Sequence, residues 1–324
     1  MRRMVLSASV ACFLIVCFSG LLPAADNPAP PAGPVRLVFI HHSTGENWLI
    51  DSNGRLGIAL RNNRYFVSDT NYGWGPADVD VGYDRIGDHT DIGHWYNWFC
   101  GPHCASYLSA LYKAGGRNCS YSRLGKNPGG ENKIILFKSC FPNSNLRGKP
   151  GDPPSAGENP LRGGDSSSPY MTVANAKGIY KDLLKYFAAH NDKLFVVITA
   201  PPLSARETSP AAANNARALN RWLVTGWLSG YPHKNVAVFD FYNVLTSNGG
   251  SPDVNDSGWA NGNHHRYWNN AVQYIQTVKH NVSAYPSDDY DSHPGVAGNR
   301  KATDEFVKLL NVFYHRWQDS LHSM

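Results

Sequence analysis

The first residues that could do chemistry follow an apolar segment near the N-terminus. Residues 35–40, VRLVFI, form a nearly continuous apolar run that predicts a strand buried in a parallel sheet. His41, His42 and Ser43 come next, and Gly45 permits a tight turn into a helix. Because catalytic groups in such sheets lie beyond the carboxyl ends of the strands, Ser43 is a candidate nucleophile. The alternative is that Ser43 only caps the following helix.

A candidate base lies near the other end of the chain. The segment before the last predicted helix reads YPSDDYDSHPG and contains His293. An imidazole held there could accept the proton of Ser43 at neutral pH. Asp291 could hold the other ring nitrogen and so fix the tautomer, and Asp288 and Asp289 are alternative orienting acids.

Polar or glycine-bearing segments also follow two other predicted strands. Gly73 and Gly75 lie in the loop TNYGWGP, where either could bring a backbone N–H close to a substrate. Asn143 and Asn145 follow the strand KIILFK. The chain therefore carries a serine, a glycine loop, an asparagine and an acid–histidine pair, each next to a predicted core element.

This order resembles the SGNH hydrolases, the superfamily of GDSL esterases and lipases. The resemblance implies that Ser43 is the nucleophile and that His293 and Asp291 complete the triad. It also implies an oxyanion hole. Its donors would be the N–H of Ser43, the N–H of Gly73 or Gly75, and the side chain of Asn143, with Asn145 as the alternate. It also implies catalysis with no metal or organic cofactor. His41 and His42 stand where the family has Gly-Asp.

A second serine matches a known motif but lacks its context. Gly164-Asp165-Ser166 is the tripeptide of the lipase signature, within the Gly-, Pro- and Ser-rich stretch 147–169. No apolar strand precedes it, so nothing would position the hydroxyl. We therefore expect Ser166 to lie in a surface loop and to take no part in catalysis.

The remaining pattern predicts how these groups are held. Apolar runs at 35–40, 65–68, 133–138, 194–199 and 236–241 predict strands, and helical patterns cover 50–63, 174–189, 215–228 and 297–317. This alternation predicts an α/β fold, a three-layer sandwich around a central, mostly parallel sheet of the flavodoxin-like kind. We expect residues 35–324 to form a single domain.

The N-terminal residues predict export. Arg2 and Arg3 precede a long apolar stretch, and Pro23-Ala24-Ala25 is a plausible cleavage zone, so residues 1–25 read as a signal peptide. An uncleaved membrane anchor is the alternative. Residues 26–34 read as a Pro/Ala linker. We expect a secreted or periplasmic protein without stable membrane association once the signal is removed.

Charge argues against one class of partner. The formal net charge of the 324-residue chain is +5, and loss of the two signal arginines leaves about +3. Lys and Arg are scattered rather than clustered in a block. Nucleic acid is therefore not an expected partner.

A long aromatic stretch separates two of the predicted strands. Residues 77–130 read as an insertion whose rings could stack on sugar, with a small satellite core as the alternative. We expect His42, Trp74 and Trp95 to contact substrate. Trp98 and Trp268 are further aromatic candidates.

The cysteines and histidines allow two other interpretations. The mature chain keeps four cysteines, for which we expect disulfides: Cys100, Cys104, Cys119 and Cys140. Cys100 and Cys104 with His89, His94 and His103 form the alternative, a zinc site. A metal-dependent hydrolase would instead use a set of six residues: His41, His42, Asp88, His89, Asp91 and His94.

The sequence thus predicts an exported serine esterase that forms an acyl-Ser43 intermediate. Export and the aromatic residues favour an O-acetylated carbohydrate as substrate. Three alternatives remain at this point. They are an acyltransferase with the same site, the metal-dependent hydrolase, and a non-catalytic carbohydrate-binding protein, which the absence of Gly-Asp before Ser43 leaves open.

Overall fold

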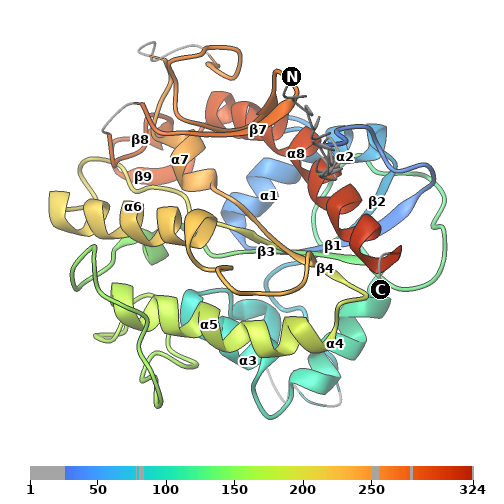
Figure 1. Ribbon diagram of the computed structural model, residues 1–324, viewed down its shortest axis with the longest axis horizontal. Helices are drawn as coiled ribbons and strands as arrows, with labels where there is room; N and C mark the ends of the chain where they lie inside the picture. The colour runs from blue at the N-terminus through green and yellow to red at the C-terminus, as the bar shows by residue number, and fades with distance from the viewer. Residues whose placement is uncertain (1–25, 78, 80–83, 250–254, 278–279, 323–324) are drawn as a thin grey trace, which may run out of the picture.

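The apolar runs of the sequence form one five-stranded parallel sheet in the computed structural model (Figure 1). The structure describes residues 26–77, 79, 84–249, 255–277 and 280–322, so the expected signal peptide lies outside the described residues. The strands are β1 (Val35–Ile40), β2 (Tyr65–Thr70), β3 (Ile134–Lys138), β4 (Leu194–Ile198) and β5 (Val236–Phe239). Their order is β2-β1-β3-β4-β5, and each neighbouring pair is parallel. The predicted α/β class and parallel sheet are confirmed.

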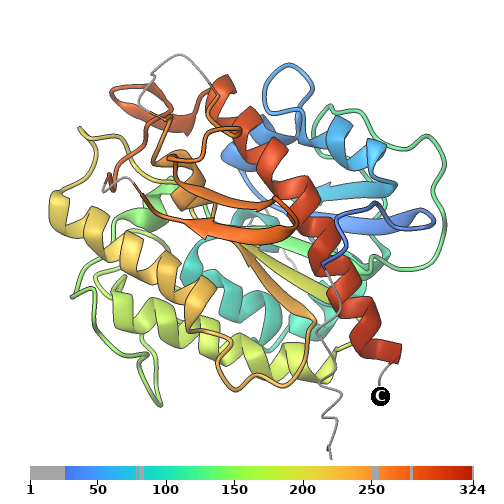
Figure 2. The ribbon, with the colours of Figure 1, turned by 45° about the horizontal axis from the view of Figure 1, so that its top comes forward.

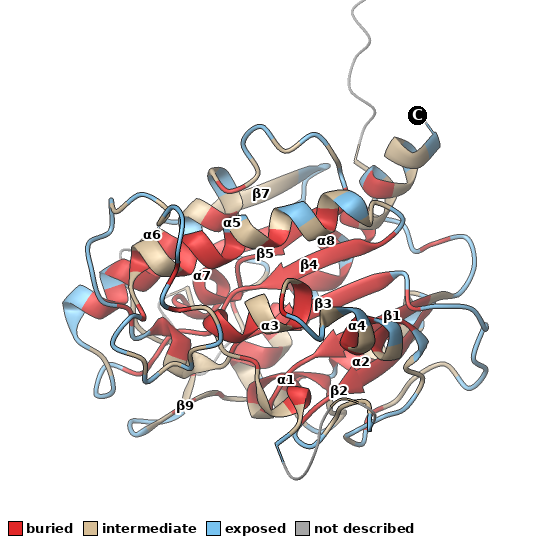
Figure 3. Cartoon of the chain, turned by 90° about the horizontal axis from the view of Figure 1, so that it is seen from below, coloured by how far each residue is buried: buried red, intermediate tan, exposed pale blue. Residues whose placement is uncertain are grey.

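Two layers of helices cover the sheet. One face carries α3 (Trp95–Phe99), α4 (Cys104–Lys113), α5 (Val173–Ala189) and α6 (Pro210–Thr225). The other face carries α1 (Ser43–Leu49), α2 (Leu56–Asn62), α7 (Phe241–Leu245) and α8 (Val296–His322). Side chains of β1, β3, β4 and β5 alternate between two apolar clusters, one under each layer, whereas β2 contributes to the second cluster alone. Figure 3 shows the strands buried between the helices. The arrangement is a three-layer sandwich.

Capping residues set the starts of the two long helices on the first face. The Thr172 hydroxyl accepts from the N–H of Asn175 at 3.2 Å and begins α5. The Ser209 hydroxyl accepts from the N–H of Ala212 at 3.1 Å, and Pro210 takes the first helical position of α6. Ser209 and Pro210 thus place the start of α6 five residues before residue 215, where the sequence predicted it.

Two hairpins were not predicted. The first joins β6 (His264–Trp268) to β7 (Ala271–Ile275) and lies beside α8 (Figure 2). Asn269 and Asn270 form its turn with φ of 49° and 62°, the left-handed pair that short hairpin turns require. The second joins β8 (Pro286–Asp288) to β9 (Asp291–Pro294) just before α8.

The stretch 77–130 is not a separate insertion. It contains the short 3-10 helices η1 (Ile86–Asp88) and η2 (Ile92–His94), followed by α3 and α4. Side chains of α3 and α4 join the main apolar cluster together with β3 and α5. Residues 95–113 are therefore part of the helical layer that carries the chain from β2 to β3.

Two other segments, 26–34 and 147–169, contain no helix or strand. In the segment 26–34, the Asp26 carboxylate pairs with Arg316 of α8 at 2.7 Å, and the carbonyl of Pro28 accepts from Asn311 at 2.8 Å. The stretch 147–169 has no helix or strand, as predicted for a surface loop. Among the described residues, no helix combines the length and the apolar character needed to cross a bilayer.

Candidate active site

The structure brings Ser43, His293 and Asp291 together in one hydrogen-bonded chain. Ser43 is the first residue of α1 and follows the carboxyl end of β1, whereas β9 supplies the other two. Ser43 Oγ lies 2.8 Å from His293 Nε2, and His293 Nδ1 lies 2.5 Å from Asp291 Oδ1. This is the order of contacts that lets a histidine take a proton from serine while a carboxylate holds its other nitrogen.

Asp291 is the acid that orients His293. Its Oδ1 also accepts from the backbone N–H of His293 at 2.9 Å. Partial burial raises the pKa of the Asp291 carboxyl, but the hydrogen bonds from His293 outweigh burial and lower it below its usual range. Asp289 is used elsewhere, in a 2.9 Å pair with Arg206, and Asp288 accepts from the N–H of Tyr290.

Ser43 is not a helix cap. The capping position of α1 belongs to His42, whose side chain makes no capping bond, and the Ser43 hydroxyl points to His293 instead. Gly45 is needed in this turn because a Cβ there would overlap the side chain of His41. Within the described residues the N–H of Ser43 has no hydrogen-bond partner, so it is free to meet a developing oxyanion.

Two of the other predicted oxyanion donors, Gly73 and Asn143, are occupied. The N–H of Gly73 (φ 72°) donates to Asp88 Oδ1 at 2.9 Å. The Asn143 amide donates to Asp91 Oδ1 at 2.5 Å and to the carbonyl of Cys140 at 3.2 Å. Its oxygen accepts from the N–H of Ile92 at 2.8 Å.

This occupancy corrects the predicted oxyanion hole. Gly73 is not an available donor, because its N–H already serves a carboxylate. Of the two glycines, Gly75 is the one whose N–H has no partner within the described part of the chain. Asn143 can donate to an oxyanion only by exchanging its longer bond, the one to the Cys140 carbonyl.

Two of the three predicted substrate contacts are wrong. Trp95 is fully buried, donates from Nε1 to Ser139 Oγ at 2.9 Å and packs edge-on against Phe137. The apolar face of α3 faces the sheet, which draws this ring into the core. His42 is 8% exposed and lies under the ring of Tyr72, with centroids 3.9 Å apart.

The remaining tryptophans divide between core and surface. Trp74 is half-buried and stacks on Trp98, with ring centroids 5.7 Å apart. Trp98 itself is fully buried, and its Nε1 donates to the carbonyl of His89 at 2.7 Å. Trp268 remains exposed on β6, whereas Trp95 and Trp98 bring the α3 part of the 77–130 stretch into the core.

Two residues beside Ser43 were missed. Tyr72, 59% exposed, stacks its ring on that of His42, the residue before Ser43, with centroids 3.9 Å apart. Lys138 is fully buried at the end of β3, and its Nζ donates to the hydroxyl of Thr44 and to the carbonyl of Ser139. Burial lowers the pKa of Lys138. A lysine closing the apolar run KIILFK was the available signal for it.

His42 predicts a loss of stability in acid. Burial lowers the pKa of His42 from 6.5 to about 4, and its Nε2 donates to the carbonyl of Gly87 at 2.6 Å. Between these values the unfolded chain binds a proton that the folded chain does not. The free energy of unfolding therefore falls as pH falls, with about 3 kcal/mol lost by pH 4. Urea unfolding at pH 7 and pH 4.5 measures this loss.

The matched variant for this prediction is His42→Gln, whose amide can still donate to Gly87. We expect the variant to lose less stability than the wild type between the two pH values. Equal losses in both proteins would show that His42 is not the source.

A pocket of about 310 Å³ lies beside Phe141, whose ring contacts His293. Phe141, from η3 (Phe141–Ser144), contacts the His293 ring edge-on with centroids 4.8 Å apart and forms one wall. The other lining residues are mostly polar and include Asn145, Ser166, Ser167 and Glu207. As predicted, Ser166 lies in a loop, and its N–H donates to Asp91 Oδ2 at 2.9 Å. It borders the site rather than forming it.

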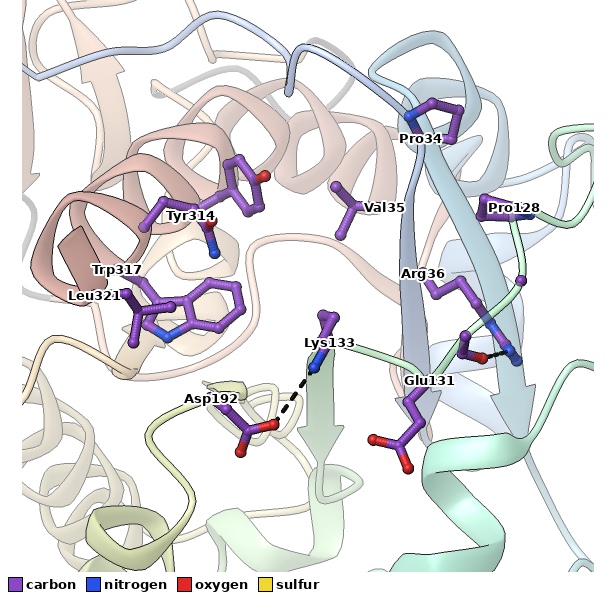
Figure 4. A pocket seen from close by; sticks show the side chains of 13 residues that line it. Pro34, Val35, Arg36, Pro128, Glu131, Lys133, Asp192, Tyr314, Trp317 and Leu321 are labelled. Atoms are coloured by element: carbon purple, nitrogen blue, oxygen red, sulfur yellow. Dashed lines mark hydrogen bonds and ion pairs between the residues drawn. The ribbon is translucent and has the colours of Figure 1, made fainter.

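A second pocket, of about 450 Å³, lies at the amino ends of the strands, on the opposite side of the sheet from Ser43 (Figure 4). Val35 and Lys133 line it at the amino ends of β1 and β3, and Trp317 of α8 closes one side. Lys133 pairs there with Asp192 at 3.4 Å. This pocket contains no triad residue.

Within the described part of the chain, neither the expected disulfides nor the two alternative metal sites are formed. All four described cysteines are free thiols; Cys100 Sγ contacts the carbonyl of Asp182, and Cys140 Sγ contacts Thr44. Among the described residues, neither the Cys100–Cys104 histidine set nor the six-residue hydrolase set forms a ligand cluster. Asp88 and Asp91 instead hold backbone and amide N–H groups of the loops around the triad.

Comparisons with protein-family models, with curated protein sequences and with solved structures give no match to this chain.

Proposed function

We propose that this chain is an exported serine esterase of the SGNH type that hydrolyses O-acyl esters. The observation that supports it most is the hydrogen-bonded series Ser43–His293–Asp291 at the carboxyl end of β1. Ser43 follows a strand and opens a helix, so its hydroxyl and its own N–H face the same space. That combination suits nucleophilic attack on an ester carbonyl.

In the proposed reaction, Ser43 Oγ attacks the ester carbonyl while His293 Nε2 takes its proton. Asp291 holds Nδ1–H and stabilises the imidazolium that forms. The N–H groups of Ser43 and Gly75 meet the oxyanion, and the buried Lys138 holds the Thr44 hydroxyl and so supports the Ser43 turn from below. His293 then protonates the leaving alcohol, and a water activated by the same ring hydrolyses the acyl-Ser43 ester.

The pocket beside His293 supports a carbohydrate as the alcohol part of the substrate. Its hydroxyls, amide and carboxylate can form hydrogen bonds with several sugar hydroxyls, and Phe141 offers a ring face. The proposed natural substrate is therefore an O-acetylated carbohydrate.

Acetate release tests this substrate class. The purified protein is incubated with acetylated polysaccharide and, separately, with short aryl acetates and long-chain acyl esters. We expect release from the polysaccharide. Turnover of aryl or lipid esters alone would overturn the carbohydrate assignment, and transfer of acetyl to an added sugar acceptor instead of water would identify an acyltransferase.

We propose that the Tyr72 hydroxyl forms a hydrogen bond of about 1.4 kcal/mol next to the nucleophile when substrate is bound, so Tyr72→Phe should lower kcat/KM about 10-fold. The ring still stacks on His42, so the fold should be kept. Ester hydrolysis assays on the variant measure the effect. Tyr170→Phe, at another exposed tyrosine, is the control and should leave kcat/KM unchanged.

A further inference from the structure

Three potential metal ligands converge behind the candidate active site. His41 directly follows β1, Asp69 lies in β2, and Cys119 comes from the segment between α4 and β3. His41 Nε2 lies 3.2 Å from Asp69 Oδ2, and Cys119 Sγ lies 3.7 Å from the same oxygen. One ligand atom from each residue lies within 4.8 Å of the other two. His41 and Asp69 are almost fully buried.

The hydrogen bonds of His41 leave a lone pair facing this cluster. Its Nδ1 lies 2.9 Å from the backbone carbonyl of His42. A carbonyl only accepts, so Nδ1 carries the proton, and Nε2 of the neutral ring then directs its lone pair at the Asp69 carboxylate. Two acceptors face each other at 3.2 Å. A positive species must lie between them, either a second proton on the ring or a metal ion.

The groups around the cluster are arranged as they are around bound metals. Histidine ligands usually donate their second nitrogen to a carbonyl, as His41 does to His42, and ligating carboxylates are themselves hydrogen-bonded. Asp69 Oδ1 accepts from the N–H of Asn118 and from the hydroxyl of Tyr121, each at 2.9 Å. This leaves Oδ2 for the cluster.

The spacing also suits tetrahedral zinc. Usual zinc bond lengths and tetrahedral angles put nitrogen and oxygen ligands about 3.3 Å apart, and sulfur and oxygen ligands about 3.5 Å apart. The observed separations are 3.2 and 3.7 Å. A set of one imidazole, one carboxylate and one thiolate matches zinc better than magnesium or calcium, which prefer oxygen ligands.

We propose that His41, Asp69 and Cys119 bind one structural Zn²⁺, with water as the fourth ligand. This goes beyond the proposed esterase function and replaces the expectation of no metal. On binding, the Cys119 thiol releases its proton to solvent and the thiolate bonds to zinc. The ion joins the ends of β1 and β2 to the 77–130 stretch. Because His41 and Asp69 are buried, it supports the turn that carries Ser43 and does not contact substrate.

Metal content tests the proposal directly. The purified protein is loaded with Zn²⁺, dialysed to remove loose metal and analysed by elemental mass spectrometry. We expect one zinc per chain in the wild type and in Cys100→Ser, and loss of at least about 10-fold in retained zinc for Cys119→Ser and Asp69→Asn. Co²⁺ in place of zinc should give a thiolate-to-cobalt absorption band in the wild type that Cys119→Ser lacks.

Two results would overturn the proposal. One is less than a tenth of an equivalent of zinc retained by folded wild-type protein, which identifies the cluster as a protonated His41–Asp69 pair. The other is equal zinc retention in the wild type and Cys119→Ser. Circular dichroism confirms that each variant is folded, so a loss of zinc is not a loss of fold.

Discussion

Replacing Ser43 or His293 by alanine should lower kcat for hydrolysis of a chromogenic acetyl ester by at least about 10⁴-fold. The two groups act as one unit, because the hydroxyl is a weak nucleophile until the ring 2.8 Å away takes its proton. The double variant should therefore be no less active than either single variant, within a few-fold. Steady-state kinetics on the four proteins measures this.

The matched control is Ser166→Ala, which removes the serine of the Gly-Asp-Ser tripeptide at the edge of the pocket. We expect it to keep kcat within about 3-fold of wild type, since its described contact is made through the backbone. If Ser43→Ala keeps full activity, the proposed nucleophile is wrong. If Ser166→Ala instead abolishes turnover, the nucleophile lies on the surface loop.

Asp291→Asn is expected to reduce kcat on the order of 10⁴-fold at neutral pH. An asparagine is nearly the same size but presents an amide, so it favours the tautomer of His293 that has its proton on Nε2. That tautomer cannot accept from Ser43. The amide nitrogen that faces the ring also replaces the acceptor of the His293 N–H, but the pairing of β9 with β8 is unchanged, so the hairpin should remain folded.

Asp288→Asn and Asp289→Asn separate this effect from a general loss of negative charge. Both acids lie within three residues of Asp291, yet neither bonds to the His293 ring in the described structure. We expect either variant to keep kcat within about 3-fold of wild type. A loss in either that matches Asp291→Asn would mean that the orienting acid is misassigned.

Apolar runs made the sheet predictable because a parallel strand buried on both faces cannot contain many polar residues. The same logic located Ser43, whereas His293 was predicted from its place beside acidic residues just before the last helix. The first hairpin carried its own signal in Asn269-Asn270, a turn pair between alternating residues. This pair was sufficient to predict the hairpin from the sequence.

The errors came from side chains whose environment depends on distant partners. Trp95 reads equally well as a sugar-stacking ring or a core residue, and only its packing on Phe137 decides between them. Asn143 sits where an oxyanion donor would be expected, but Asp91, more than fifty positions earlier, takes its amide. The residues next to Trp95 or Asn143 in the sequence do not indicate which distant side chains these two will contact.

The short spacing between Asp291 and His293 has a consequence for how activity depends on folding. The acid and the base share one strand, and a single oxygen of Asp291 holds both the ring and the backbone of His293. Their mutual geometry is therefore local and survives as long as that strand does. The contact with Ser43, by contrast, joins positions 250 residues apart. Turnover thus depends on one long-range contact, between Ser43 and His293. Measuring turnover therefore reports whether the β8–β9 hairpin is packed in its native position next to Ser43.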